Sequence, residues 1–298
     1  MRKTVVLMIV FGGLILNCGT KSSLPPVLKQ NISIRDSSGK LLPEMNEMIK
    51  RLTKTEVIFV GEIHNDSLTH VVEVELLKRI FHRGHNIAIS LEMFERDVQK
   101  YLDDYLEEKI TEKKFLSVSR PWNNYKTAYR PLVEFAKEKG LPVLAMNVPR
   151  RYANRVAVMG GAALEALPDS EKVWVARQLK PLNDEYKKRF IQEMGGTRPG
   201  PMMRFKPENL YKAQCLKDDT MAESIAEFLE KHPGIKIVSY QGDFHSDYSL
   251  GIVKKLKLLN PSVKVSVVSI VPVKDLGKIK IESFKNRADF LIFVQNNF

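Results

Sequence analysis

The sequence has little cysteine and almost no long apolar runs. Two cysteines in 298 residues exclude a disulfide-dense fold. Charged residues make up 28% of the chain, and a single stretch near the N-terminus is apolar enough to consider as a membrane segment, which excludes a polytopic membrane protein. What remains is a well-mixed chain with 44% apolar residues, long enough for one substantial core or two smaller ones.

The N-terminus has the layout of an export signal. Met1-Arg2-Lys3 is positively charged, the run from Val5 to Leu16 is apolar, and Cys18 follows just before a polar stretch. A cysteine at this place is typical of a bacterial lipoprotein signal, in which residues 1–18 form the signal and Cys18 is lipidated; Asn17 stands where Gly, Ala or Ser is usual, and plain secretion is the alternative. We therefore expect an exported protein, anchored by lipid to a bacterial membrane, with residues 19–30 as a tether.

The net charge of +12 is compatible with several classes of partner, including nucleic acid, an anionic membrane surface and an anionic ligand. Export would separate the chain from nucleic acid, and the sequence shows no basic stripe with interleaved aromatic residues, so we expect no nucleic-acid partner. Most of the charge lies on lysine-rich segments. Arg130, Arg150 and Arg151 are the arginines placed where they could hold an anionic ligand.

Short apolar runs alternate with amphipathic stretches, which predicts an α/β domain over 31–298 with a mostly parallel sheet and flanking helices. The expected crossover helices are Leu68–Phe81, Arg96–Glu108, Tyr125–Lys139 and Tyr248–Leu259. An all-helical insertion is expected over about 151–231, and its Gly/Pro-rich segment from Met194 to Met203 is either a lid or an ordinary surface connection. The expected strands are Glu56–Gly61, Asn86–Glu92, Pro142–Asn147, Lys236–Gly242, Lys264–Pro272 and Asp289–Gln295.

Polar residues follow four of these strands, at the edge where parallel sheets bind ligands. Gly61-Glu62-Ile63-His64 and Gly242-Asp243-Phe244-His245 give two Gly-x-x-His motifs about 180 residues apart, and Glu92 ends the second strand. His64, His245 and a carboxylate from Glu92 or Glu62 would suit a divalent metal ion with an open position. The same four residues would also serve as a metal-free acid/base set, or the histidines are structural loop residues. His70 either reaches this site or faces solvent.

A second cluster holds Trp122, Tyr125, Tyr129 and Arg130. Tyrosinate ligates ferric haem and arginine pairs with propionates, so the cluster would suit a haem edge; aromatic residues at this spacing are also common in cores. Further along, Asn147 ends a strand, and Arg150 and Arg151 begin a helix where an anion could bind.

Taken in order, these motifs resemble the ChaN-like haem-binding lipoproteins, which form the haem-binding uptake family of the Tiki superfamily. The resemblance implies an α/β fold with a helical subdomain, membrane anchoring, and haem bound at a homodimer interface with a tyrosine among the iron ligands. The motifs that carry it are Val60–His64 with His70, Ser90–Phe94 with Gln99, Trp122 with Tyr125 and Tyr129, Pro142–Asn147 with Arg150, Gln214 with Asp218 and Thr220–Ala222, and Gly242 with His245.

The resemblance leaves two functions open. The first is haem capture in haem or iron uptake, with Tyr125, Tyr129, Arg130, Asn147, Arg150 and His70 as candidate haem-binding residues. The alternative is a metal-dependent hydrolase, protease-like or esterase-like, because related members of the superfamily use Gly-x-x-His motifs or Glu/His pairs. In that case Glu62, His64, Glu92 and His245 would be catalytic, with His64, Glu92 and His245 on the metal ion.

Overall fold

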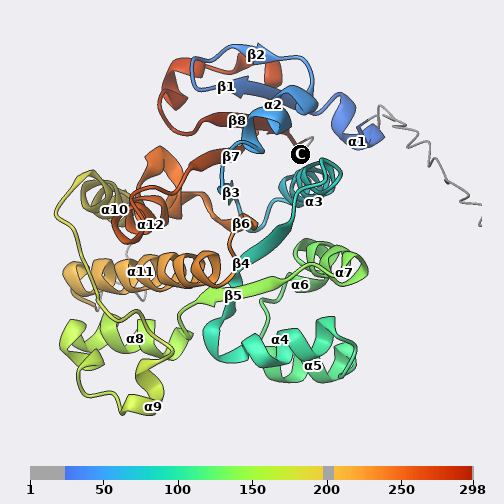
Figure 1. Ribbon diagram of the computed structural model, residues 1–298. Coiled ribbons are helices and arrows are strands. Elements are labelled where there is room, and N and C mark those ends of the chain that lie inside the picture. Colours follow the sequence, from blue (N-terminus) through green and yellow to red (C-terminus); the bar gives the residue numbers. More distant parts are fainter. Residues whose placement is uncertain (1–23, 197–204, 297–298) are drawn as a thin grey trace, which may run out of the picture.

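A sheet of eight strands runs through the middle of the molecule in the order β2-β1-β8-β7-β3-β6-β4-β5 (Figure 1). The structure is a computed structural model and describes residues 24–196 and 205–296. The strands from β8 to β5 are all parallel, whereas β1 pairs antiparallel with β8 and with β2. Their bounds are β1 Ile32–Asp36, β2 Leu41–Leu42, β3 Val57–Glu62, β4 Ile87–Glu95, β5 Val143–Asn147, β6 Lys236–Gly242, β7 Val265–Val273 and β8 Phe290–Gln295.

Helices cover both faces of the sheet, as the sequence predicts for an α/β protein. In Figure 1, α3, α6 and α7 lie on one side of the sheet, and α8, α11 and α12 lie on the other. The helices are α1 Pro26–Lys29, α2 Met45–Leu52, α3 Ser67–Phe81, α4 Gln99–Leu106, α5 Glu112–Ser119, α6 Tyr125–Ala128, α7 Arg130–Lys139, α8 Arg150–Met159, α9 Asp169–Lys172, α10 Glu185–Gly196, α11 Pro207–Lys231 and α12 Gly251–Leu259. Short 3₁₀ segments are η1 Arg96–Val98, η2 Gly161–Leu164, η4 Asp243–His245, η5 Asp247–Ser249, η6 Leu276–Lys278 and η7 Ile281–Phe284.

The packing of the central strand β3 explains why its first four residues, Val57 to Val60, are all apolar. Successive side chains of a strand point to opposite faces. Ile58 and Val60 pack in one core cluster with residues of α2, α3 and α7, while Val57 and Phe59 pack in a second cluster with residues of α11 and α12. Both faces of the strand are therefore buried, and a run without polar alternation results.

Local chemistry fixes several element ends. Asp66 caps α3 by accepting a hydrogen bond from the backbone N–H of Thr69 at 2.7 Å. The single helix expected from Tyr125 to Lys139 is divided at Tyr129, because Pro131 occupies the first turn of α7 and has no N–H to continue α6. The helix expected from Tyr248 begins instead at Gly251, because Tyr248 and Ser249 have φ values of 61° and 55°.

The N-terminal end of the described chain is more ordered than the sequence predicts. Residues 26–29, expected in the tether, form α1, and the Leu28 side chain is fully buried against the core. The hairpin of β1 and β2 was not expected at all, since five residues with half-buried side chains give a weak pattern. Gly39, with a φ of 84°, makes the turn between these strands. The sheet is thus larger than expected and antiparallel at this edge.

The region from 151 to 231 contains helices and, among its described residues, no strand, as expected. Its longest helix, α11, does not stand apart from the domain: it packs against β5, α8 and α12 and covers one face of the sheet. Arg96 strengthens this packing by donating to Ser224 Oγ and to the carbonyl oxygen of Thr220, both at 2.7 Å. Beyond the end of α10, the expected lid segment lies outside the described residues.

Candidate functional site: a polar cluster at the strand ends

Buried polar side chains meet where β3, β4 and β6 end. Register places Glu62 of β3 beside Gly242 of β6, and the backbone N–H of Gly242 donates to Glu92 Oε2 at 2.8 Å. The two Gly-x-x-His motifs and the strand-end glutamate therefore lie together in the structure, at the edge of the sheet where the sequence places them. We call the following set the strand-end cluster: Glu62, His64, His70, Glu73, Glu92, Tyr129, Asp218 and His245.

The glycines of the two motifs let the motifs cross at close range. A Cβ atom on Gly61 would lie 2.9 Å from the Cα atom of Asp243, in the second motif. A Cβ atom on Gly242 would lie 2.9 Å from Nε2 of His64, in the first motif. Each glycine therefore leaves space for the other motif. This close approach, more than the turn that follows each strand, explains why both positions are glycine.

His64 forms a tight pair with Glu62. Its Nδ1 lies 2.6 Å from Glu62 Oε1, and the Tyr129 hydroxyl donates to the same oxygen at 2.5 Å. Burial opposes the charge on His64, but the bond to Glu62 and the negative charge of Glu92 raise its pKa. Burial would raise the pKa of Glu62, but the hydrogen bonds from His64 and Glu73 lower it instead. Together these shifts favour an imidazolium–carboxylate pair.

His245 lies between two carboxylates. Its Nδ1 is 2.6 Å from Asp218 Oδ1, and its Nε2 is 3.3 Å from Glu92 Oε1. Burial disfavours the charged ring, yet the charges of Glu92 and Asp218 raise the pKa of His245 to about 10. The Tyr186 hydroxyl donates to the other Asp218 oxygen at 2.7 Å. His245 is therefore a buried cation at neutral pH, with both ring nitrogens engaged.

His70 reaches the site, which decides between the two expectations for it. Its side chain is 6% exposed, and its Nδ1 lies 2.8 Å from Glu73 Oε2 and 3.5 Å from Glu62 Oε2. Burial and the nearby charge of Glu62 raise the pKa of Glu73 well above its ordinary value. Within residues 24–196 and 205–296, the one group of three side chains whose potential ligand atoms all lie within 4.8 Å of one another is Glu62, His70 and Glu73. The expected metal set of His64, Glu92 and His245 stays a prediction.

His64 is the exposed member of the cluster. Its side chain is 38% exposed, whereas those of Glu62 and His245 are 1% and 7% exposed. The Trp122 ring meets the imidazole edge-on, with the ring centroids 4.7 Å apart. An imidazole that a buried carboxylate orients through Nδ1 can offer Nε2 as a metal ligand or as a general base.

The expected haem-edge tyrosines are both buried, at 2% exposure each. Tyr125 packs beside Phe94 and Phe115, and its buried hydroxyl has no hydrogen-bond partner among the residues that the structure describes. Tyr129 belongs to the strand-end cluster. Burial raises the pKa of both phenols, and for Tyr129 the charge of Glu62 raises it further, so neither is ready to form a tyrosinate.

The other expected haem-binding residues make mainly structural contacts. Arg130 pairs with Glu112, donating from Nε at 2.5 Å. The Asn147 amide donates to the backbone oxygen of Glu92 at 3.0 Å and so holds β5 against β4 near the cluster. Arg150 donates its backbone N–H to Glu95, and its side chain is exposed.

Three residues of the site were harder to find in the sequence. In the sequence, Asp218 stands with Gln214 among the motifs of the resemblance, but nothing there links it to His245. Glu73 and Tyr186 gave no signal beyond ordinary helix patterns, although Glu73 follows His70 by three residues and so shares its helix face. Burial alone distinguishes them, and it depends on tertiary packing.

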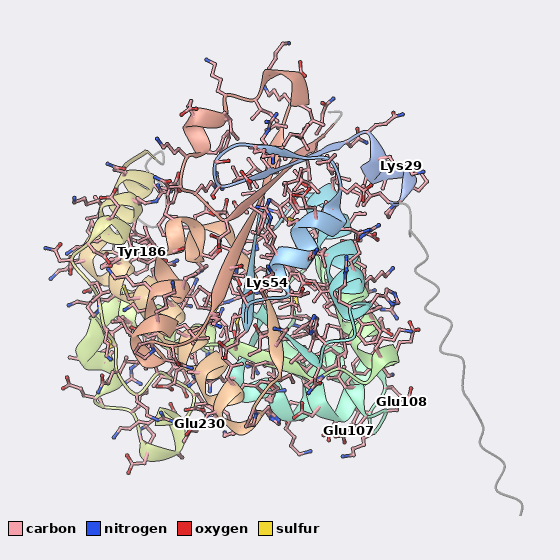
Figure 2. All side chains as sticks on the ribbon, turned by 45° about the horizontal axis from the view of Figure 1, so that its top comes forward. Lys29, Lys54, Glu107, Glu108, Tyr186 and Glu230 are labelled. Atoms are coloured by element: carbon pink, nitrogen blue, oxygen red, sulfur yellow. The ribbon has the colours of Figure 1, made fainter. Side chains whose placement is uncertain are left out.

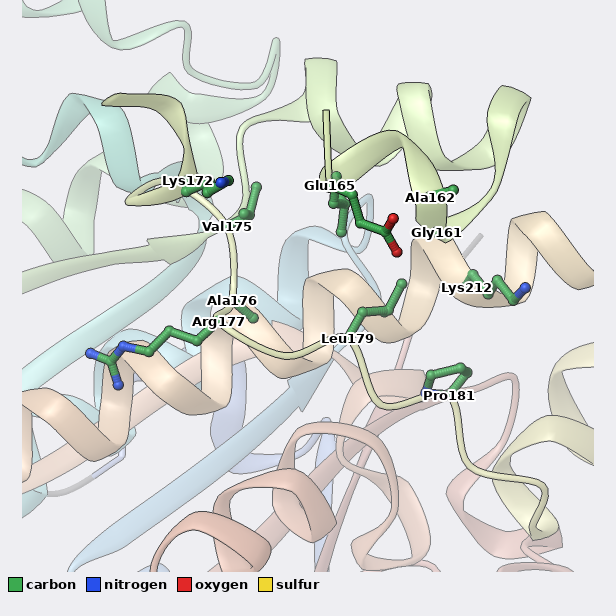
Figure 3. Close-up of a pocket in the computed structure, with 11 residues that line it drawn as sticks. Gly161, Ala162, Glu165, Lys172, Val175, Ala176, Arg177, Leu179, Pro181 and Lys212 are labelled. Carbon is green, nitrogen blue, oxygen red and sulfur yellow. The ribbon is translucent and has the colours of Figure 1, made fainter. Parts of the chain in front are cut away.

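A separate cavity of about 850 Å³ lies outside the cluster, between η2, the segment from Lys172 to Pro181 and α11 (Figure 3). Arg177, Lys172, Lys212 and Glu165 project from its walls. None of its lining residues belongs to the strand-end cluster. This cavity and the strand-end cluster are therefore two different places.

Two expectations concern the cysteines and the membrane. Cys18 lies outside the described residues. Cys215 is fully buried in α11, as expected of a small helix residue, and burial raises the pKa of its thiol to about 12. Among the described helices, none has both the length and the apolar character that crossing a membrane requires.

The mostly parallel sheet, its flanking helices and the Glu/His cluster at the strand ends define the class: an α/β protein with a polar site at the carboxyl edge of its sheet. The sequence profile of the haem-binding uptake family ChaN, of the Tiki superfamily, matches residues 48–256, and the chain belongs to this family. This confirms the resemblance drawn from the motifs.

Known proteins extend the comparison at low identity. The structure of ChaN of Campylobacter jejuni with cofacially bound haem has a TM-score of 0.67 and 19% identity to this chain, covering 90% of this chain and 98% of that one. This likeness confirms the fold. A chloroplast protein of Arabidopsis thaliana, RETICULATA-RELATED 5, is 21% identical over an alignment of 260 residues, and the match covers 81% of this chain. This chain spans 34% of the length of that plant relative.

Proposed function

We propose that this protein binds haem, with His64 as the iron ligand that the chain provides. The observation that carries the proposal is the exposed imidazole of His64, fixed by Glu62 at 2.6 Å, in a chain of the ChaN haem-binding family. The haem that is bound in ChaN of Campylobacter jejuni gives the ligand class. When bound, the haem would supply the iron centre, and His64 would bind through Nε2 after releasing the proton on that nitrogen, while Glu62 accepts the hydrogen bond from Nδ1.

The surroundings of His64 fit a flat anionic ligand. The Trp122 ring beside His64 offers an aromatic surface, and the charge of Lys217 acts on Glu92 in the same region. Lysine is a suitable partner for a propionate group. A tyrosine ligand, which the family resemblance implies, would require Tyr125 or Tyr129 to leave its buried site.

A haem titration tests the proposal. The purified chain should give a saturable Soret shift, and His64→Ala should weaken haem binding at least tenfold. His82→Ala, which removes an exposed histidine at the end of α3, is the matched control and should bind like the natural chain. Absence of a stoichiometric Soret shift, or equal binding by the His64→Ala variant, would exclude this role for His64.

We further propose that the protein acts in haem or iron uptake as a lipid-anchored, exported homodimer. The support is the signal-like sequence ending at Cys18 and, for the dimer, the family resemblance. In cells fed labelled palmitate, the chain should take up label and Cys18→Ser should not. Light scattering with and without haem should show a dimer; a monomer in both states would contradict the dimer proposal.

A second candidate function is hydrolysis, because a carboxylate–imidazole pair such as Glu62–His64 also orients a general base. A metal-dependent version would use His64, Glu92 and His245. Ester and peptide substrates should then be cleaved by the natural chain, with or without added Zn²⁺, and not by His64→Ala. A panel without turnover in either metal condition would remove this candidate.

A further inference from the structure

We infer that Glu62, His70 and Glu73 form a binding site for one divalent transition-metal ion, behind the exposed His64. Each of the three side chains is buried, and each offers an atom within 4.8 Å of the other two. Two of them lie on α3, three residues apart, and the third ends β3. A site built from one helix and one central strand is rigid, which favours metal binding.

The tautomer of His70 is set for coordination through Nδ1. Its Nε2 lies 3.0 Å from the carbonyl oxygen of His64, and a carbonyl only accepts, so the proton is on Nε2. Asn124 donates to the same oxygen at 2.7 Å and holds it in place. A metal-ligating histidine commonly donates its second N–H to such a carbonyl. The other nitrogen, Nδ1, faces Glu73 Oε2 at 2.8 Å and would bind the ion once the proton shared by Nδ1 and Glu73 is released.

Two carboxylate oxygens at this place receive no N–H or hydroxyl donor. Among the described residues, Glu62 Oε2 and Glu73 Oε1 are buried without such a donor, and the two carboxyl groups face each other closely enough to share a proton. The Glu73 side chain is fully buried, and Glu62 Oε2 lies 3.5 Å from His70 Nδ1. Buried carboxylate oxygens are costly unless a donor or a cation satisfies them. A divalent ion among these three groups would satisfy both oxygens at once.

The donor set selects the class of ion. Two carboxylates and an imidazole suit Mn²⁺, Fe²⁺, Co²⁺ or Zn²⁺, whereas Ca²⁺ and Mg²⁺ prefer oxygen ligands alone and Cu⁺ prefers sulfur. Glu62 would link this ion to the exposed face, because its other oxygen, Oε1, holds His64 and accepts from Tyr129. The site is distinct from the His64, Glu92 and His245 set, with which it shares no ligand.

Metal content and Co²⁺ titration test the inference on the full chain. The chain produced in medium with added Mn²⁺ and Zn²⁺ should carry about one ion per molecule by mass spectrometry. The chelator-stripped chain should show visible Co²⁺ bands that saturate at one equivalent. Glu73→Gln, which keeps size and hydrogen-bonding shape, should weaken Co²⁺ binding at least tenfold, and Glu73→Asp should weaken it as well.

Two matched variants locate the ion. Glu75→Gln changes a buried carboxylate on the same helix that pairs with Arg79, and should leave Co²⁺ binding unchanged. Glu92→Gln removes a carboxylate of the other set and should also leave it unchanged. Absence of stoichiometric metal in the folded chain, or Co²⁺ binding that survives Glu73→Gln and is lost in Glu92→Gln, would overturn the inference. Circular dichroism of each variant confirms that it is folded.

Discussion

His64 and His245 occupy equivalent places in two Gly-x-x-His motifs, yet their neighbours give them different properties. His64 pairs with one buried carboxylate and keeps an exposed side chain. His245 contacts two carboxylates and is buried. The same motif thus yields one residue that can meet a ligand and one that organises the interior.

The charge of His245 predicts a pH dependence of stability. Its pKa rises from 6.5 to about 10 in the folded chain, so the folded state holds the proton more tightly than the unfolded state does. The resulting stabilisation is complete below pH 6.5 and is lost as pH rises toward 10. Relative to His245→Gln, the natural chain should lose on the order of 4 kcal/mol of unfolding free energy across this interval. Urea unfolding of both proteins measures it; parallel stability curves would contradict the charge assignment.

The crossing of the two motifs predicts the effect of a single methyl group. Gly61→Ala places a Cβ atom 2.9 Å from the backbone of Asp243, which cannot move cheaply, and should destabilise the chain by about 1–3 kcal/mol. Gly161→Ala is the control, because its Cβ atom would meet the flexible Leu179 side chain at 3.3 Å. Thermal unfolding should separate the two; equal melting temperatures would show that the motifs are not tightly crossed.

At the scale of residues, the sequence predicted those site members that directly follow strands. Glu62, Glu92 and His245 end apolar runs, and parallel strands bring their carboxyl ends together. Asp218 and Glu73 come from helices, where a polar residue signals a solvated face as readily as a buried contact. The two tyrosines were open to either reading, and packing against Phe94 and Phe115 places Tyr125 in the core.

At the scale of elements, a buried network joins β4 to α11. Arg96, at the end of β4, contacts Glu223 at 3.1 Å in addition to its bonds to Ser224 and Thr220. The network fixes the helix that carries Asp218 to the sheet that carries Glu92. It therefore maintains the spacing of the two carboxylates around His245.

Removing Arg96 should be costly for that reason. Arg96→Met removes the guanidinium that pairs with buried Glu223, which keeps its hydrogen bond from the backbone N–H of Arg177, and should destabilise the chain by about 3 kcal/mol. Adding Glu223→Gln should restore part of this loss, because the uncompensated charge is gone. Chemical denaturation of both single variants and the double variant measures the coupling; strictly additive effects would show that the pair is not coupled.

The strands and helices differ in how well the sequence predicts them. The six expected strands are all present, because each is a buried apolar run of adequate length. The β1–β2 hairpin was missed because its strands are short and half-buried. Helix boundaries shifted where Pro131 or the positive φ of Tyr248 interrupts a continuous apolar pattern.

At the scale of the whole molecule, the net charge of +12 contrasts with the strand-end cluster, which contains carboxylates, imidazoles and a phenol but no lysine or arginine. Charged side chains project from all sides of the molecule in Figure 2, among them Lys29, Lys54 and Glu107. In this view the charged side chains are spread over the molecule and include both lysines and glutamates. Such a surface keeps a protein soluble and, if Cys18 is lipidated, suits a position near anionic lipid.

The most direct test of the account is the identity of the iron ligand in the haem complex. Electron paramagnetic resonance and magnetic circular dichroism of the ferric complex distinguish imidazole from tyrosinate. We predict imidazole ligation that disappears in His64→Ala and persists in Tyr125→Phe and Tyr129→Phe. A tyrosinate signal that is lost in either tyrosine variant and kept in His64→Ala would contradict the central role of His64.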